Sequence, residues 1–382
     1  MLKIIKNSTT KKARLLEINL PSGKINAPFF MPDATRAVLK NIDVETLKKL
    51  NLSAQVVNTY HLLLQPGTAI IKKAGGVHKF MNWLGPLLSD SGGFQVFSLL
   101  HRNKSMGKIF DDRVEFKSPL DGSKQILTPE KSIQIQFDLG TDMMVCLDDC
   151  PPNDLSEQAM KASVDKTIAW ARRCRAEFYR QIKKRKTDKD KRPLLFGVIQ
   201  GGESKDERKR CAESLLEIGF DGLGYGARPI DKDGNFLEEI LRYTASLIPD
   251  EYLRFGLGIG LPDDIVACVD MGWDMFDCVI PTREGRHGRL YEPIFNFQFS
   301  IFNEFKSSND SIFKTYNIKN SKYKEDFSVI NENSKLAVLR EYSRAYLHHL
   351  FKIGEPLGQR LAALNNLEFY LELMGEIRAN IK

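Results

Sequence analysis

Two aspartates, Asp90 and Asp277, each lie at the end of a short apolar run of the chain. Two carboxylates in one pocket are the arrangement used to break and form glycosidic bonds, because one can attack the anomeric carbon while the other transfers a proton. Gly92 and Gly93 follow Asp90 and would let a flat ligand approach the backbone, and Phe94 could stack on that ligand. Ordinary turn chemistry would also explain the glycine pair.

Three arginines, Arg283, Arg286 and Arg289, follow Asp277 at three-residue spacing. A guanidinium group makes bidentate hydrogen bonds to phosphate or carboxylate groups, so this cluster suggests an anionic ligand. The alternative is a buried salt bridge between Asp277 and Arg283. A sugar hydrolase would use the two aspartates but would leave the three arginines unexplained.

Further polar groups lie at the ends of other apolar runs. Asp148 and Asp149 supply acceptors, and the side-chain amide of Gln200 could read the edge of a heterocycle. Cys150 is better explained as part of a pocket wall than as a nucleophile, because no histidine is close to it in the sequence. Because polar residues and glycines recur at the ends of six runs, we expect one site there rather than isolated turns.

These ends belong to eight apolar runs of strand length, most of which are separated by helical patterns. Such alternation predicts a parallel sheet, and eight strands over about 250 residues predict a closed (β/α)8 barrel of the TIM type. An open doubly wound sheet would normally carry a glycine-rich fingerprint after its first strand, and the sequence has none. The predicted strands are Pro28–Met31, Gln55–Thr59, Pro86–Asp90, Met143–Leu147, Leu194–Ile199, Phe220–Gly224, Leu253–Gly258 and Met275–Ile280.

The segments that flank the barrel differ in character. Residues 1–27 predict a β-hairpin, with Ser22-Gly23 at its turn, that could cap the barrel floor. We therefore assign residues 1–290 to a catalytic barrel with an N-terminal hairpin. The rest of the chain, residues 291–382, is assigned to an irregular insertion followed by a helical subdomain.

The expected tail begins with Tyr291–Lys335, which is rich in Asn, Lys, Ser and Phe and predicts irregular structure. Two amphipathic helices are predicted after it, Leu336–Phe351 and Glu355–Ile377, with a break at Gly354.

The chain of 382 residues is mildly basic, with 56 lysines and arginines against 49 aspartates and glutamates and a net charge of +7. This balance permits a polyanionic partner without requiring one. The sequence has no run of about 18 apolar residues and no secretory signal pattern, so we expect neither a membrane span nor export. Its six cysteines lack the spacing of a disulfide scaffold, which fits a reducing cytoplasm.

The sequence also resembles the tRNA-guanine transglycosylase family, specifically the bacterial queuine tRNA-ribosyltransferases. The resemblance spans nearly the whole chain and implies a modified (β/α)8 barrel, in agreement with the strand count. It rests on blocks in family order: VNTYHLLLQPG (57–67), SDSGGFQVFSL (89–99), SPLDGSKQILTPE (118–130), LDDCPP (147–152), GVIQGG (197–202), DMFDCVIPTREGRHG (274–288) and YSRAYLHHL (342–350).

The resemblance further implies a reaction. The wobble guanine of GUN anticodons, found in tRNAs for aspartate, asparagine, histidine and tyrosine, is exchanged for a 7-deazaguanine without strand cleavage. Asp277 would be the nucleophile that forms a covalent ribosyl-enzyme, and Asp90 the general acid and base for the departing and arriving bases. Asp148, Gln200, Ala227, Ser91 and Cys150 would bind the base, Phe94 and Leu257 would sandwich its ring, and Arg283, Arg286 and Arg289 would hold the RNA.

One departure from the family concerns metal binding. The family's zinc site consists of three cysteines and a histidine. At these four positions the sequence has Ser334, Leu336, Leu339 and Asn365, and no cysteine follows Cys278. None of the four is a normal zinc ligand, so we expect a protein without a metal cofactor. Leu336 and Leu339 could replace the metal by packing against the last helix.

A second departure lies in residues 226–232, the loop that would read the incoming base. Ala227 replaces a glycine but keeps the backbone amide that the base would use. Arg228 and Lys232 would disfavour a cationic aminomethyl group, whereas Ile230 and Cys150 are typical of bacterial pockets. The sequence therefore leaves queuine and 7-aminomethyl-7-deazaguanine undecided as the incoming base.

The alternative function is a non-catalytic, tRNA-binding partner subunit of the same family. The replaced zinc ligands and the altered base loop favour it, but such a subunit would be expected to lack a catalytic carboxylate, and Asp90 and Asp277 are both present. Because family members are dimers, we expect a cytoplasmic homodimer whose partners are tRNA and a 7-deazaguanine. Residues Pro293–Phe313 resemble an insertion relative to the family.

Overall fold

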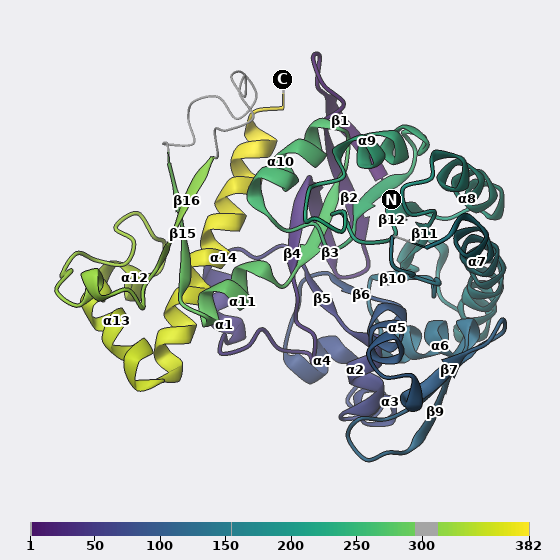
Figure 1. The fold of residues 1–382 in the computed structure, drawn as a ribbon, viewed down its shortest axis with the longest axis horizontal. Helices are drawn as coiled ribbons and strands as arrows, with labels where there is room; N and C mark the ends of the chain where they lie inside the picture. Colours follow the sequence, from purple (N-terminus) through teal and green to yellow (C-terminus); the bar gives the residue numbers. More distant parts are fainter. Residues whose placement is uncertain (1, 154, 295–311, 382) are drawn as a thin grey trace.

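The computed structural model describes residues 2–153, 155–294 and 312–381. In these residues, eight parallel strands form one sheet in the order β4-β14-β13-β12-β11-β10-β6-β5. A bridge between Asp33 and Val56, with the Ala34 amide donating to the Val56 carbonyl at 2.7 Å, joins the two end strands and closes the barrel. The predicted (β/α)8 barrel is therefore confirmed (Figure 1).

Each of the eight predicted runs overlaps one barrel strand, and β4 and β12 extend one residue beyond their runs. Several observed strands stop short of the predicted ends, because the last residues leave the ladder and turn into loops. Strand β11 is buried along its whole length, as expected where a parallel sheet is covered on both faces. The strands are β4 (Phe29–Pro32), β5 (Gln55–Val57), β6 (Leu87–Ser89), β10 (Met143–Val145), β11 (Leu194–Ile199), β12 (Gly222–Tyr225), β13 (Leu253–Gly256) and β14 (Met275–Cys278).

Helices cover the outside of the barrel, and their ends follow ordinary capping rules. The N-cap Ser204 of α8 accepts from the Glu207 amide, and the N-cap Ser156 of α7 accepts from the Ala159 amide. No described helix is long and apolar enough to cross a membrane. The helices between barrel strands include α1 (Val44–Lys49), α6 (Pro129–Leu139), α7 (Glu157–Arg185), α8 (Lys205–Ile218), α9 (Glu238–Ser246) and α10 (Pro262–Asp270).

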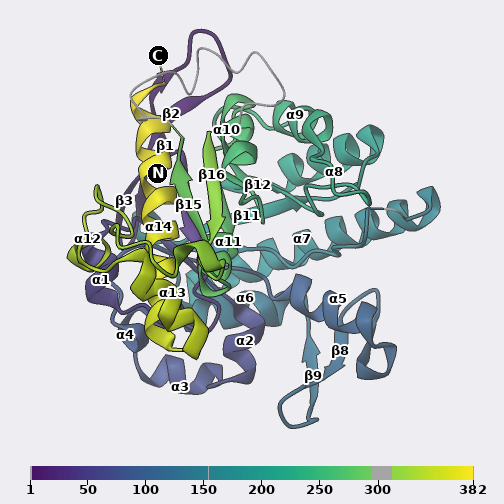
Figure 2. The ribbon, with the colours of Figure 1, turned by 60° about the vertical axis from the view of Figure 1, so that its left-hand side comes forward.

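Two barrel connections contain elements that the sequence did not predict. Between β5 and β6 lie α2 (Thr59–Leu64), α3 (Thr68–Lys73) and α4 (Val77–Met81). After β6 come α5 (Gly93–Arg102) and an antiparallel sheet that projects from the barrel in Figure 2. The strands of this sheet are β7 (Gly107–Ile109), β8 (Val114–Lys117) and β9 (Lys124–Leu127).

The N-terminal hairpin caps the barrel floor, as predicted, and carries an additional strand. Strand β1 (Leu2–Asn7) pairs with β2 (Arg14–Leu20), which pairs with β3 (Gly23–Ala27). The Ser22 amide donates to Asp142, just before β10, and buried Arg14 forms a bidentate pair with buried Asp274, just before β14. Apolar residues of β2 and β3 pack into the barrel interior, so this sheet closes its lower end.

The tail differs from the prediction in two places. The segment expected to be irregular contains β16 (Phe313–Asn317), which pairs with β15 (Arg289–Pro293), while most of the predicted insertion lies outside the described residues. The first predicted helix is two helices, α12 (Ala337–Glu341) and α13 (Arg344–Ile353), because the Ser343 side chain caps a new start. The last helix, α14 (Pro356–Ala379), lies between the barrel and these elements (Figure 1).

The four positions at which the family resemblance places zinc ligands serve other purposes here. Leu336 and Leu339 are buried in a cluster that includes apolar residues of α14, as the packing hypothesis requires. The Asn365 side-chain amide donates to the Tyr291 carbonyl. The Ser334 hydroxyl donates to buried Glu368 of α14. Aliphatic side chains have no lone pairs to offer, so this donor set does not fit zinc.

Glu368 is the polar link that joins the 334–336 segment to α14. It accepts from the Ser334 hydroxyl and from the Lys335 amide, the latter at 2.6 Å. Glu368→Ala would leave both donors without their acceptor in a buried environment, so we expect a loss of about 2 kcal/mol in the free energy of unfolding. Chemical denaturation of the two proteins measures this loss.

The matched control is Glu368→Gln, which retains one acceptor oxygen and should lose less stability than Glu368→Ala. We also expect a metal chelator to leave the melting temperature of the wild type unchanged. One zinc per chain by elemental analysis, or a melting temperature that falls with chelator, would contradict the expectation of a metal-free tail.

Candidate active site

The carboxyl ends of four adjacent strands place polar side chains on the inner rim of the barrel. Side chains on a strand alternate between its two faces, so the residue two positions after an interior residue also faces inward. Met31, Val56, Leu88 and Met275 belong to the interior cluster. Two positions further along the same strands are Asp33 after β4, Asn58 after β5, Asp90 after β6 and Asp277 on β14.

Asp90 is held by donors from the neighbouring strand end and from its own loop. The amides of Thr59 and Gly92 donate to one carboxylate oxygen at 2.9 and 3.1 Å, and the Asn58 side-chain amide donates to the other. Burial nevertheless raises the pKa of Asp90 to about 8, and the nearby charges of Asp33 and Asp277 add to the rise. Asp90 can therefore carry a proton at neutral pH.

Asp277 is also buried and hydrogen-bonded to a backbone amide, but its pKa is raised less than that of Asp90. The Gly258 amide donates to its carboxylate at 3.0 Å. Burial raises the pKa of Asp277 to about 7, with a contribution from the charge of Asp33. No salt bridge joins Asp277 to Arg283 in the described part of the chain, so the alternative of a structural ion pair is wrong. The carboxylate remains available to a ligand.

Asp33 is the rim residue that the sequence analysis missed. It directly follows the first barrel strand, and its carboxylate accepts from the Thr35 hydroxyl at 2.9 Å. Burial raises the pKa of Asp33, while the Thr35 hydrogen bonds and the charge of Arg286 oppose that rise. Applying the two-residue alternation to the run Pro28–Met31 would have revealed it, because Asp33 follows the inward-facing Met31.

The opposite part of the rim carries Asp148 and Gln200. The Gln200 side-chain nitrogen donates to Asp148 at 2.7 Å, and the Gln200 side-chain oxygen is buried without a partner among the described residues. Burial raises the pKa of Asp148 to about 6. A side chain at Gly226 would collide with the Gln200 amide, because its Cβ would lie 2.5 Å from Nε2. The hydrogen-bonded pair of Asp148 and Gln200 thus depends on a glycine at position 226.

The thiol of Cys150 lies in an environment that keeps it protonated. Burial raises the pKa of its thiol to about 12, and only the Gln200 side chain and the Ala227 backbone oppose this rise. A thiol that remains protonated is a poor nucleophile. The raised pKa therefore argues against Cys150 as a nucleophile, and its place in a pocket wall stays a prediction.

Three further predicted ligand residues occupy this end of the barrel in different environments. Phe94 on α5 is 55% exposed, and half-buried Leu257 follows β13 with its side chain over Gly224. Ser91 is buried, and its hydroxyl accepts from the Gly93 amide. The Phe94 ring is therefore accessible to a ligand. The Ser91 hydroxyl, by contrast, already accepts a hydrogen bond within its own turn.

The three arginines lie on α11 (Ile280–Arg286) and at the start of β15. Arg283 is exposed, and Arg286 is half-buried with its charge acting on Asp33. Arg289 donates to the Thr315 hydroxyl and lies 3.6 Å from Glu284. Arg286 is thus close enough for its charge to act on Asp33, and Arg283 acts on Cys278 and on Arg286, whereas Arg289 is already engaged with neighbouring side chains.

A buried arginine, Arg208, fixes the loops that follow β11 and β12. The Arg208 guanidinium donates to the carbonyls of Ile199, Gly202 and Gly226 and stacks on the Tyr225 ring, 4.1 Å from its centroid. These contacts tie the loop after β11 to the loop after β12. Sequence reasoning had no signal for this residue, because an arginine on an amphipathic helix normally faces solvent.

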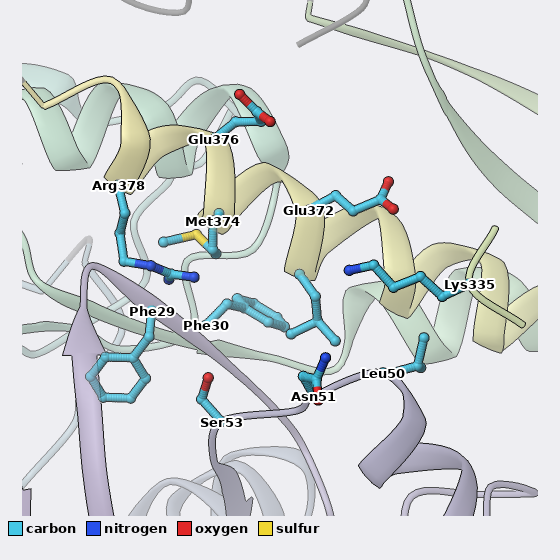
Figure 3. A pocket seen from close by; sticks show the side chains of 12 residues that line it. Phe29, Phe30, Leu50, Asn51, Ser53, Lys335, Glu372, Met374, Glu376 and Arg378 are labelled. Carbon is cyan, nitrogen blue, oxygen red and sulfur yellow. The ribbon is translucent and has the colours of Figure 1, made fainter. Parts of the chain in front are cut away.

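A pocket of about 610 Å³ lies elsewhere in the fold. Figure 3 shows that its walls come from α14, from β4 and from the segment after α1. The Arg378 side chain, which borders it, donates to the Pro28 carbonyl at 2.7 Å. None of the candidate catalytic, base-binding or RNA-binding residues lines this pocket, so it is separate from the site.

Comparison with known proteins agrees with this architecture along the whole chain. A family model described as queuine tRNA-ribosyltransferase matches residues 8–382. The chain belongs to the queuine tRNA-ribosyltransferase family. A relative of that name from Staphylococcus haemolyticus is 40% identical over 378 residues, covering 99% of this chain and 91% of its own. Another, from Shouchella clausii, is 41% identical over 377 residues, with the same coverage.

Membership of the queuine tRNA-ribosyltransferase family makes the chain a glycosyltransferase of the pentosyltransferase class. Another relative with the same name, from Thermoanaerobacter pseudethanolicus, is 40% identical over 380 residues and is matched over 93% of its length. The family resemblance that the sequence motifs indicated is therefore confirmed.

Within this family site, Ala227 has an unusual backbone conformation. Its φ is +92°, in the region that side chains with a Cβ rarely adopt. We expect Ala227→Gly to raise the free energy of unfolding by about 1 kcal/mol, because glycine adopts this φ without strain. Thermal or chemical denaturation measures the change.

The matched control is Ala245→Gly in α9, where the same substitution should destabilise the protein because glycine is unfavourable in a helix and a buried methyl group is lost. Equal losses of stability in both variants would show that the positive φ of Ala227 carries no strain.

Proposed function

We propose that the chain exchanges the wobble guanine of GUN-anticodon tRNAs for a 7-deazaguanine through a covalent Asp277–ribosyl intermediate. The observation that carries this proposal is the pair Asp90 and Asp277 on one rim, with pKa values near 8 and 7. Between these values Asp277 is ionised and Asp90 protonated, which are the states that a nucleophile and a general acid need.

The first displacement would release guanine. A carboxylate oxygen of Asp277 attacks C1′ of the ribose while the bond from C1′ to the guanine nitrogen breaks. Asp90 gives its proton to the departing base, so neutral guanine leaves and Asp90 becomes ionised. The RNA backbone is untouched, because only the bond between sugar and base breaks.

The second displacement would attach the new base. Ionised Asp90 removes the ring N–H proton of the 7-deazaguanine, and the freed nitrogen attacks C1′. The Asp277 carboxylate departs, which restores both side chains to their starting states. Two inversions at one carbon retain its configuration, as in retaining glycosidases.

The base would be recognised by Asp148 and Gln200. A guanine-type edge presents N–H donors next to a carbonyl oxygen, and the ionised Asp148 carboxylate accepts from such donors. The partnerless Gln200 oxygen provides a second buried acceptor. A buried acceptor without a partner is costly, so its presence supports a ligand that donates to it.

Arg283 and Arg286 would bind phosphates of the anticodon loop. Both lie on α11, directly after the strand that carries Asp277, and Arg283 is exposed. Phosphate contacts of this kind position the RNA and weaken as salt concentration rises. A flipped base stacked against Phe94 and Leu257 would complete the usual mode of recognition for a single-stranded loop. Homodimer formation and a cytoplasmic location stay predictions.

Base exchange is tested with an unmodified GUN-anticodon tRNA whose wobble guanine is radiolabelled. We expect label release on addition of queuine or of 7-aminomethyl-7-deazaguanine, and the ratio of the two rates identifies the incoming base. Asp277→Asn should lower release by at least about 1,000-fold, because the amide cannot act as nucleophile. The wild type alone should form a complex with the RNA that survives denaturing electrophoresis.

The control for this assay is Asp188→Asn, an exposed aspartate before β11 that lies far from the rim. It should retain wild-type release. A folded wild type that binds the tRNA but releases no label with either base would contradict the proposal and favour the non-catalytic partner subunit.

The acidity of the two carboxyl groups predicts a narrow pH optimum. Because Asp277 must be ionised and Asp90 protonated in the first displacement, kcat/KM should fall below about pH 7 and above about pH 8. Single-turnover guanine release measured from pH 5.5 to 9.5 gives this profile. A rate that rises steadily up to pH 9.5 would show that protonated Asp90 is not required.

A further inference from the structure

Asp33 lies between the two proposed catalytic carboxylates along the rim. Strand β4 pairs with β14 on one side, with Met31 opposite Asp277, and contacts β5 on the other through the bridge from Asp33 to Val56. Strand β5 in turn pairs with β6, which leads into Asp90. The order of the inward-facing polar residues around this arc is therefore Asp277, Asp33, Asn58 and Asp90.

The Asp33 carboxylate is only weakly neutralised. It accepts a hydrogen bond from Thr35, and no lysine or arginine forms an ion pair with it in the described ranges. Arg286 of α11 is the cation whose charge acts on it, and Arg286 is itself half-buried. The other titratable groups that experience the charge of Asp33 are Asp90 at the end of β6 and Asp277 and Cys278 on β14.

We propose that Asp33 is a positioning residue of the active site, whose negative charge holds one proton on the Asp90–Asp277 pair at neutral pH. The proposal rests on the proposed function, in which this pair performs both displacements. Like charges that share a poorly solvated site cannot all ionise, so a third carboxylate nearby favours the singly protonated state of the other two. Asp33 touches neither the ribose nor the base in this role.

The charge of Asp33 also fits the position of Arg286. An arginine next to two catalytic carboxylates would lower their proton affinity, which would leave Asp90 ionised and unable to donate. Burial and the charge of Arg283 lower the pKa of Arg286, and the charge of Asp33 opposes this lowering, so the two charges offset each other. Arg286 can then approach an RNA phosphate without removing the proton from Asp90.

The test compares the pH dependence of single-turnover guanine release by the wild type and Asp33→Asn. Asparagine keeps the size of the side chain and an oxygen that can accept from Thr35, but it removes the charge. Both limbs of the profile should move to lower pH by at least about half a unit, because removal of a nearby negative charge lowers the pKa of a carboxyl group. Asp33→Ser is a second neutral variant if the asparagine form folds poorly.

A readout that does not need activity accompanies this assay. Carbon-13 NMR of protein labelled at aspartate carboxyl carbons follows the titration of Asp90 and Asp277, with Asp90→Asn and Asp277→Asn used to assign the signals. Both groups should titrate at lower pH in Asp33→Asn than in the wild type. Asp188→Asn, the exposed control at the other end of the barrel, should leave the two titrations unchanged.

The outcomes separate the two proposals. An unchanged NMR titration in Asp33→Asn would overturn the role of Asp33, and so would a uniform loss of rate at every pH without a shift of the profile. A wild type without base exchange would contradict the proposed function, yet the NMR arm would still decide whether Asp33 controls the protonation of the pair.

Discussion

The confinement of like charges at one end of the barrel is the constraint on which the site depends. Closure of the barrel brings the carboxyl ends of β14, β4, β5 and β6 together, and three of them carry aspartates. Backbone amides compensate part of the free-energy cost of burying these charges, since Thr59 and Gly92 donate to Asp90 and Gly258 donates to Asp277. The remaining desolvation is what raises both pKa values into the neutral range.

The rim is thus divided into two functional parts. Strands β14, β4 and β6 carry or lead into Asp277, Asp33 and Asp90, and only Asp90 would change its protonation in the proposed reaction. Strands β10, β11 and β12 lead to Asp148, Gln200 and Ala227, which are proposed to bind the base. Arg208 stiffens the second part, because it binds carbonyls in two successive loops from a buried position. The proposed exchange requires a rigid base-binding surface beside the carboxyl groups that hold the proton. The departing and the arriving base must both meet the same hydrogen-bond acceptors.

The sequence predicted the features that follow from hydrophobic periodicity and missed those that depend on single contacts. Eight apolar runs located all the barrel strands, because a strand buried on both faces must be apolar throughout. The break between α12 and α13 was missed, because a serine inside a helical pattern caps a helix only when the chain turns there. The pairing of β15 with β16 was also missed, because a long segment rich in Asn, Lys, Ser and Phe separates the two strands and its composition predicts irregular structure.

The same distinction applies to the site residues. Asp90 and Asp277 were predictable, since their local motifs are rich in glycine and arginine. Asp33 has an undistinguished neighbourhood, PDAT, and only its register on the first strand reveals that it faces inward. The strain at Ala227 was not predictable, because an alanine gives no sign of a positive φ. Sequence spacing therefore indicates the chemistry of the site. Strand register and barrel closure determine which further charged groups, such as Asp33, lie close enough to affect the pKa values of Asp90 and Asp277.

The tail is part of this arrangement because α14 positions the helix that carries Arg283 and Arg286. Helix α11 packs so closely on α14 that a side chain at Gly285 would lie 2.6 Å from the Ala363 backbone. The Asn366 side-chain amide donates to the carbonyls of Pro281 and Arg289, at the two ends of that segment. Whatever fixes α14 therefore also fixes the arginines relative to Asp277. In a chain whose zinc positions offer no suitable ligands, the buried Glu368 link and the leucine packing around it help to fix α14, so under the proposed function the tail would affect RNA binding as well as stability.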